Sequence, residues 1–160
     1  MLTDDEKCAL IRKLRDSDNS YQMRAPLTRA NIPDICACEI IEPLAKDPSL
    51  SIKNIVIKLQ DKLPKECACD ILEVLSKDLS VNVRSRLAVY QKGVPEECAC
   101  DIFYRLSHDS EAIVRDGVAG NVSIPKKCMC DILEDLEIDK TSYVRMSAED
   151  NPLYEKCNKT

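Results

Sequence analysis

The stretch of sequence that decides the fold reads LPKECACDILEVL and runs from Leu63 to Leu75. The same frame occurs in three other places: an aliphatic residue and a proline, then Cys-x-Cys, an acidic residue, two apolar residues and a closing leucine. The prolines that open the four frames are Pro33, Pro64, Pro95 and Pro125, so consecutive frames lie 31, 31 and 30 residues apart. Self-similarity at a period of this size is typical of repeat proteins.

The N-terminal segment fits the same frame, with Leu10, Ile11 and Leu14 at the apolar positions. We therefore expect five repeats of 30–31 residues in one domain that spans residues 1–160, the last repeat being truncated. Their approximate bounds are 1–31, 32–62, 63–93, 94–123 and 124–160.

Each repeat is predicted to be a pair of helices. Because proline suits the first position of a helix, where its missing N–H needs no partner, each frame proline is expected to be the first residue of a helix. At 100° per residue, the apolar residues of the frame that starts at Cys67 fall within about 140°, which is one amphipathic face. A second helix follows, with its apolar face at Val83, Leu87 and Ala88. One such pair cannot bury its apolar faces alone, so neighbouring repeats must stack.

The pattern Leu106-x-x-Asp109, Val114-Arg115 and Ala119 resembles HEAT repeats and the leucine-rich-repeat variant, and the long unit of this chain favours the HEAT-like form. The resemblance covers nearly the whole chain and implies an all-α fold, a right-handed α-solenoid of helix pairs. It also implies a ladder of charges between repeats, for which the alternative is solvated surface charge. The ladder residues are Asp18, Arg24, Asp47, Lys53, Asp78, Arg84, Asp109, Arg115, Asp139 and Arg145.

The ten cysteines are spaced so that they can pair between repeats. Residues i and i+2 of a helix point about 200° apart, so the two thiols of one Cys-x-Cys frame face the preceding and the following repeat. Cys8 aligns with the second cysteine of a frame and Cys157 with the first, so every inner flank carries a thiol and both outer flanks carry none. The predicted pairs are Cys8–Cys36, Cys38–Cys67, Cys69–Cys98, Cys100–Cys128 and Cys130–Cys157.

Three chemical states are open to these facing pairs: disulfides, reduced thiols that pack as small apolar groups, and metal ligands. The Cys-x-x-Cys spacing of common zinc sites does not occur in the sequence, although two facing thiols suffice for copper(I). The sequence therefore favours pairing without a cofactor. A thiol-based module that binds copper(I) or zinc, or that acts in redox chemistry, is the alternative function.

No pattern in the sequence predicts an enzyme. The single histidine, His108, falls in a turn at the far end of the helix that carries Cys98 and Cys100, too distant to activate either thiol. The motifs of nucleotide-binding proteins and common hydrolases are absent from the sequence. The net charge of −5 argues against nucleic acid as a partner, and no apolar run is long enough for a membrane span.

The repeats instead favour a non-enzymatic scaffold that binds another protein or a peptide. A solenoid offers a long concave face for such a partner, usually lined by the second helices. Arg86 and Tyr90 lie on a predicted second helix and are of the types that dominate interfaces, with ordinary surface residues as the alternative. The acidic N-terminus predicts a cytoplasmic chain, whereas oxidised cysteine pairs and a removed leader would indicate a location outside the cytoplasm. The oligomeric state is left open.

Overall fold

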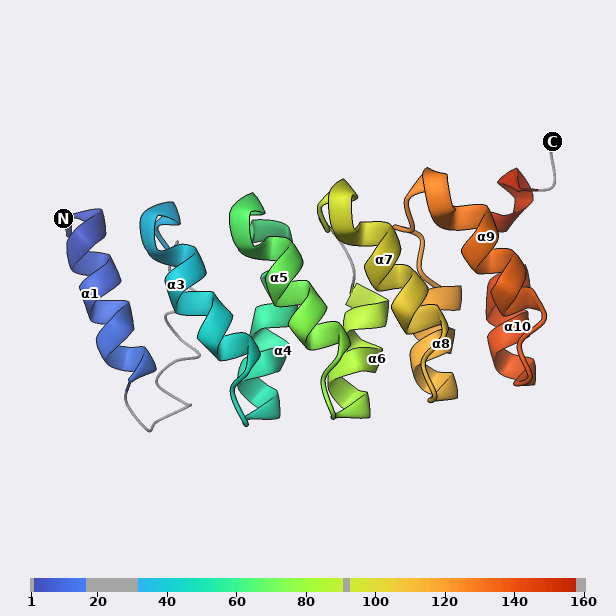
Figure 1. The fold of residues 1–160 in the computed structure, drawn as a ribbon, viewed down its shortest axis with the longest axis horizontal. Coiled ribbons are helices and arrows are strands. Elements are labelled where there is room, and N and C mark those ends of the chain that lie inside the picture. The colour runs from blue at the N-terminus through green and yellow to red at the C-terminus, as the bar shows by residue number, and fades with distance from the viewer. Residues whose placement is uncertain (1, 17–31, 91–92, 158–160) are drawn as a thin grey trace.

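The computed structural model describes residues 2–16, 32–90 and 93–157, and all regular elements in these ranges are helices, arranged in two layers (Figure 1). The first helices of the repeats form one layer: α1 (Asp4–Arg15), α3 (Asp34–Ala45), α5 (Lys65–Ser76), α7 (Glu96–Ser107) and α9 (Lys126–Glu137). The second helices form the other layer: α4 (Leu50–Lys58), α6 (Val81–Tyr90), α8 (Ala112–Ala119) and α10 (Ser142–Glu149). Two short 3₁₀ helices, η1 (Gln60–Lys62) and η2 (Tyr154–Lys156), follow α4 and α10.

The helices of each layer stand side by side in chain order, so the repeats form a single row with α1 at one end and α9 and α10 at the other (Figure 1). The prediction of an all-α fold is confirmed for the described residues. The second helix expected in the first repeat, with Asp18 and Arg24, lies outside them. None of the described helices is long and apolar enough to cross a membrane.

The frame prolines lie one residue earlier than the sequence predicts. Pro33, Pro64, Pro95 and Pro125 are N-cap residues that precede the helices, with φ between −61° and −56° and ψ between 135° and 138°. The prediction of the first helical position was wrong because the φ that the proline ring imposes fits both positions, while the extended ψ belongs to the cap. The carbonyl of each proline accepts a hydrogen bond from the backbone N–H of the first frame cysteine.

The hydrophobic core is continuous between repeats. Ile40, Ile71, Ile102 and Ile132 occupy the same place in four successive first helices, and none is more than 1% exposed. Leu10 occupies this place in α1, at the end of the row, and is 51% exposed. Burial of a side chain of this size stabilises the fold by about 1.5–3 kcal/mol. Each repeat therefore draws a large part of its stability from its neighbour.

Candidate functional site

Four disulfides join the successive first helices into a ladder and a fifth joins α9 to Cys157 after η2, and these are the five pairs that the sequence predicts. The Cα atoms of the bonded cysteines lie 5.3–6.1 Å apart, within the range that disulfides prefer. Cys36 of α3 bonds backward to Cys8 of α1, while Cys38 bonds forward to Cys67 of α5. The described residues contain no free cysteine.

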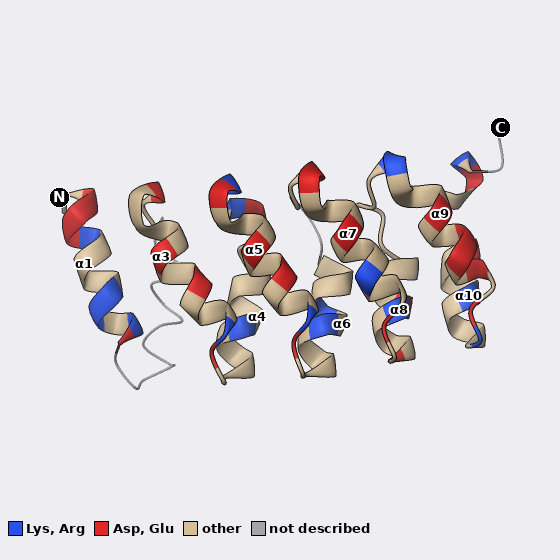
Figure 2. Ribbon diagram, in the orientation of Figure 1, with Lys and Arg blue, Asp and Glu red and all other residues tan. Residues whose placement is uncertain are grey.

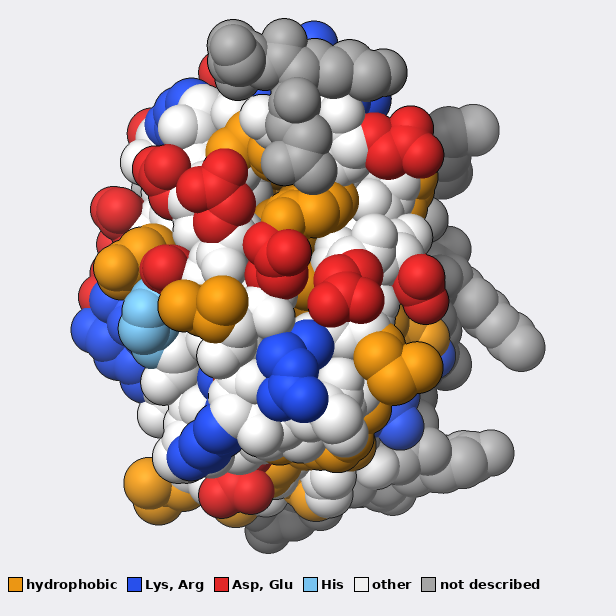
Figure 3. Space-filling model, turned by 90° about the vertical axis from the view of Figure 1, so that its right-hand side faces the viewer, with side chains coloured by type: hydrophobic (Ala, Val, Ile, Leu, Met, Phe, Trp, Pro, Cys, Tyr) orange, Lys and Arg blue, Asp and Glu red, His pale blue; other side chains and the backbone are white. Residues whose placement is uncertain are grey.

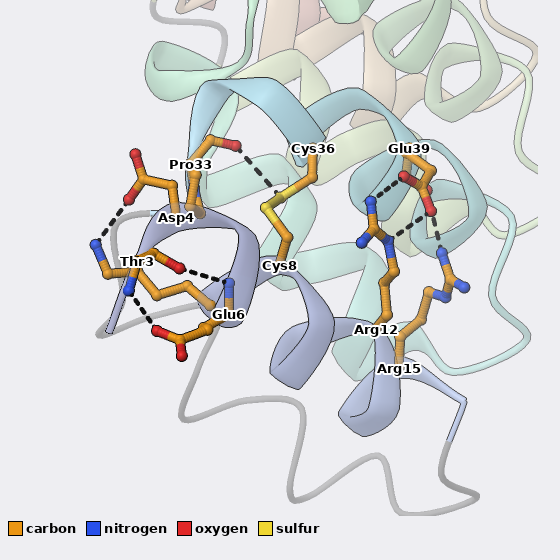
Figure 4. The surroundings of a disulfide bond; sticks show 10 residues. Thr3, Asp4, Glu6, Cys8, Arg12, Arg15, Pro33, Cys36 and Glu39 are labelled. Carbon is orange, nitrogen blue, oxygen red and sulfur yellow. Dashed lines mark hydrogen bonds and ion pairs between the residues drawn. A yellow bond between two sulfur atoms is a disulfide. The ribbon is translucent and has the colours of Figure 1, made fainter. Parts of the chain in front are cut away.

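We call the contact between two neighbouring repeats a seam. The surroundings of the first disulfide show a disulfide and an ion pair in the same seam (Figure 4). Cys8 and Cys36 are both 2% exposed. One turn along α1 from Cys8, Arg12 donates from Nε and Nη2 to the two carboxylate oxygens of Glu39 in α3, over 2.9 and 2.7 Å. Arg15 reaches the backbone carbonyl of Glu39 over 3.3 Å. The hydrogen bonds from Arg12 hold the pKa of the Glu39 carboxyl below its usual value.

In the predicted charge ladder, three cations, Lys53, Arg84 and Arg115, bind the aspartate of the following repeat. Arg84 donates from Nε and Nη2 to both carboxylate oxygens of Asp109, over 2.6 and 3.0 Å. Arg115 binds Asp139 over the same two distances. In addition, Arg84 donates from Nη1 to the backbone carbonyl of Asp78 in its own repeat, over 2.7 Å. One guanidinium thus ties the turn of its own repeat to the turn of the next.

The remaining ladder residues follow the same scheme as far as the structure describes them. Lys53 lies 2.5 Å from a carboxylate oxygen of Asp78 in the next repeat. Asp47 accepts a hydrogen bond from the backbone N–H of Ser49 over 2.6 Å. Arg145, at the end of the row, donates to the backbone carbonyl of Asp139 over 2.6 Å.

Three of the ladder carboxylates are largely shielded from solvent. Their side chains are only 8–9% exposed in Asp78, Asp109 and Asp139. Burial raises the pKa of Asp109, but hydrogen bonds from Arg84 and from the backbone N–H of Glu111 outweigh it and leave this pKa below its usual value. The hydrogen bonds from Arg115 likewise lower the pKa of Asp139. Solvated surface charges would not show this geometry, so the ladder is part of the packed seam.

A second ladder, made of side-chain amides, was not predicted from the sequence. Asn121 donates from Nδ2 to the backbone carbonyl of Ala88 over 2.7 Å, and Asn151 donates to that of Ala119 over 2.6 Å. Both side chains are buried, and they tie the turn after one second helix to the end of the preceding second helix. Gln60, after α4, bonds in the opposite direction, to the carbonyl of Tyr90 at the end of the next second helix, α6. The available signal was an Asn or Gln six or seven residues after each ladder cation: Asn31, Gln60, Gln91, Asn121 and Asn151.

The structure brings the two predicted partner-binding residues, Arg86 and Tyr90, into one groove on the second-helix layer. The groove crosses α4, α6 and α8 and has a volume of about 540 Å³. Val89 and Ile113 line it with 57% and 56% of their surfaces exposed. Arg86 and Asp116 add charges of opposite sign to the lining. Exposed apolar side chains beside a few charged groups are typical of protein interfaces.

The first-helix layer presents a different surface, because exposed acidic residues recur on successive helices (Figure 2). They include Glu39, Glu42, Asp70, Glu73, Asp101, Asp131 and Glu134. Arg105 interrupts this row and lies 3.8 Å from Glu73. At the C-terminal end of the molecule, acidic, basic and apolar side chains are mixed and form no single apolar face (Figure 3).

His108 caps the C-terminal end of α7, as its predicted turn position implies. Its ring lies 4.4 Å from the ring of Tyr104, and Nε2 lies 3.9 Å from a carboxylate oxygen of Asp135 in the next repeat. Cys98 and Cys100 are at the other end of α7, where each forms a disulfide. The structure therefore does not bring His108 together with a thiol.

Comparisons of the chain with protein-family models, with curated proteins and with solved structures found no match.

Proposed function

We propose that this protein is a HEAT-like, right-handed α-solenoid that acts as a non-enzymatic scaffold and binds another protein, or a peptide segment of one, on its second-helix face. The groove across α4, α6 and α8 is the observation that carries this proposal, because it combines exposed apolar surface with Arg86 and Tyr90. An extended segment with apolar side chains for Val89 and Ile113 and an acidic residue for Arg86 would complement the groove.

The distribution of recurring polar residues supports a scaffold. The disulfides, the charge ladder and the amide ladder all lie in the seams, where each holds one repeat to the next. Such a frame keeps the second-helix face rigid, which lowers the entropy lost when a partner binds. The five disulfides also support a location in an oxidising compartment.

A selection of peptides from a displayed random library on the oxidised protein tests the proposal. We expect peptides that bind the groove, and Arg86→Ala or Tyr90→Ala to weaken them at least about tenfold, because Arg and Tyr at the centre of an interface contribute most of its affinity. Tyr104→Ala is the matched control, since Tyr104 is a 52% exposed tyrosine on α7 in the other layer, whereas Tyr90 is 44% exposed. Peptides that lose affinity only with Tyr104→Ala would contradict the proposal.

The alternative function, a thiol-based metal or redox module, requires free thiols. In the structure the ten cysteines are bonded in five disulfides. Only the reduced chain could therefore serve this function.

A further inference from the structure

One cluster away from the groove combines three side chains that bind metals. The sulfur atoms of Cys38 and Cys67 and a carboxylate oxygen of Glu42 all lie within 4.8 Å of one another. Cys38 and Glu42 are four residues apart in α3, so they are stacked one helical turn apart on the same face. Cys67 approaches from the first turn of α5, with its Cα 5.7 Å from that of Cys38. In the oxidised chain the two sulfurs are bonded to each other.

We propose that reduction of the Cys38–Cys67 disulfide creates a zinc site formed by the two thiolates and the Glu42 carboxylate. Zinc binds cysteine sulfur and carboxylate oxygen in a tetrahedral arrangement, and three protein ligands leave the fourth position to water. This inference rests on the metal-binding alternative and not on the scaffold. Its failure would leave peptide binding in the groove unaffected, because Glu42 and both cysteines lie in the first-helix layer.

The reaction balances with a dithiol reductant and a zinc ion. Thiol–disulfide exchange passes two electrons and two protons to Cys38 and Cys67, and the reductant becomes a disulfide. Zn²⁺ then displaces the two thiol protons, so that binding releases two protons to solvent. Cys38 is half-buried, whereas Cys67 is 2% exposed. The reductant therefore attacks this bond at the sulfur of Cys38.

The identity of the residue four positions after the second frame cysteine sets this seam apart. In the five frames this residue is Arg12, Glu42, Glu73, Tyr104 and Glu134. Arg12 and Tyr104 cannot act as carboxylate ligands. Glu73 is bound by Lys77 over 2.5 Å. Of the described residues, only Cys38, Glu42 and Cys67 form a cluster of three potential ligands whose ligand atoms lie within 4.8 Å of one another.

The test uses the full chain, reduced without oxygen by a water-soluble phosphine. The phosphine takes the oxygen of one water molecule per disulfide and becomes the phosphine oxide, while its two electrons and the two protons of the water pass to the sulfurs. Zinc affinity is measured by competition with a chromogenic chelator, and proton release by titration in weak buffer. Alkylation of the remaining free thiols, followed by mass spectrometry, identifies the cysteines that zinc protects.

We expect one tightly bound zinc ion, two released protons, and protection of Cys38 and Cys67. Glu42→Gln should lower the affinity at least about tenfold, since loss of even an outer-shell partner costs 10- to 100-fold. Glu134→Gln changes the same frame position in another repeat and should leave the affinity unchanged. Because Glu42 is exposed, its replacement leaves the core intact. Equal affinity of Glu42→Gln and the unaltered chain, protection of other cysteines, or absence of zinc binding would each overturn the proposal.

Discussion

Asp109 shows, at the scale of a single residue, why each repeat carries an aspartate between its helices. Its Oδ1 accepts a hydrogen bond from the backbone N–H of Glu111 at the start of α8. Both of its carboxylate oxygens also bind Arg84 of the preceding repeat. One carboxylate thus shapes a turn within a repeat and forms an ion pair between repeats, so its replacement should affect both.

We predict that Asp109→Asn lowers the free energy of unfolding at pH 7 by about 1–3 kcal/mol, because the substitution removes the negative charge that Arg84 binds. The folded-state pKa of Asp109 is lowered, so the unfolded chain binds more protons in acid. The stabilisation is therefore present at neutral pH and is lost as the pH falls below the usual aspartate pKa of about 4 and through the lower folded-state pKa. Urea unfolding across this range should show a shallower loss of stability in Asp109→Asn.

Asp131→Asn is the matched control for this prediction, since Asp131 is an exposed aspartate of the first-helix layer. We expect it to change the stability by less than about 0.5 kcal/mol and to retain the acid dependence of the unaltered chain. If the stability of Asp109→Asn depended on pH as that of the unaltered chain does, the pKa of Asp109 would not differ between the folded and the unfolded state, and the prediction would be wrong.

At the scale of elements, the close approach of α6 and α8 depends on Gly117. A Cβ atom at this position would lie 2.9 Å from Cβ of Ala88 and 3.2 Å from Cγ2 of Val89. The Cβ atom of Ala88 is fixed to the backbone and cannot turn aside, so the two helices would have to move apart. Gly117 also lines the groove, which links the packing of these helices to the proposed binding face.

We predict that Gly117→Ala destabilises the protein by up to about 2 kcal/mol. Overpacking costs about 1–3 kcal/mol, which exceeds the gain of about 1 kcal/mol from placing alanine in a helix. Gly120→Ala is the control, because its Cβ would meet nothing closer than 3.7 Å and its φ is −84°. Thermal unfolding should show an unchanged or slightly raised midpoint for Gly120→Ala. A raised midpoint for Gly117→Ala would contradict the close contact.

The elements differ in how far the sequence predicts them. The partners of Cys38 and Cys67 followed from local geometry, because an i, i+2 pair must face two flanks in any helix. The hydrogen bond from the side-chain amide of Asn121 to Ala88 could not be derived in this way, since it depends on how the turn after α8 packs against the end of α6. The groove at Tyr90 likewise depends on the spacing of neighbouring helices, which periodicity does not determine. Recurring sequence patterns thus predicted the disulfide and charge ladders, whereas the amide hydrogen bonds and the groove could not be predicted from them.

At the scale of the whole molecule, stability is distributed along a row in which each repeat contacts mainly its neighbours. An interior seam therefore divides the row, whereas the last seam holds only η2 to α9. The disulfides of these seams, Cys69–Cys98 and Cys130–Cys157, span similar sequence separations of 29 and 27 residues. In the chain-entropy model each contributes about 3–4 kcal/mol.

We predict that Cys69→Ala/Cys98→Ala and Cys130→Ala/Cys157→Ala differ in where the protein opens, although they remove loops of similar length. Loss of the interior bond should weaken amide-hydrogen protection throughout α5, α6, α7 and α8, because neighbours on both sides lose support. Loss of the terminal bond should weaken it in η2 and the end of α9 alone. Hydrogen exchange read by mass spectrometry measures both patterns, and identical patterns would refute a nearest-neighbour row.

The disulfide ladder also gives the molecule a short covalent route from end to end. From Cys8 to Cys157 this route crosses five sulfur–sulfur bonds and the four Cys-x-Cys segments, and it bypasses every helix of the second layer. A mechanical pull along the row would load these bonds, while the loops and second helices would carry almost no tension. The oxidised protein should therefore resist extension under force and keep molecules attached to its two ends at a nearly constant distance.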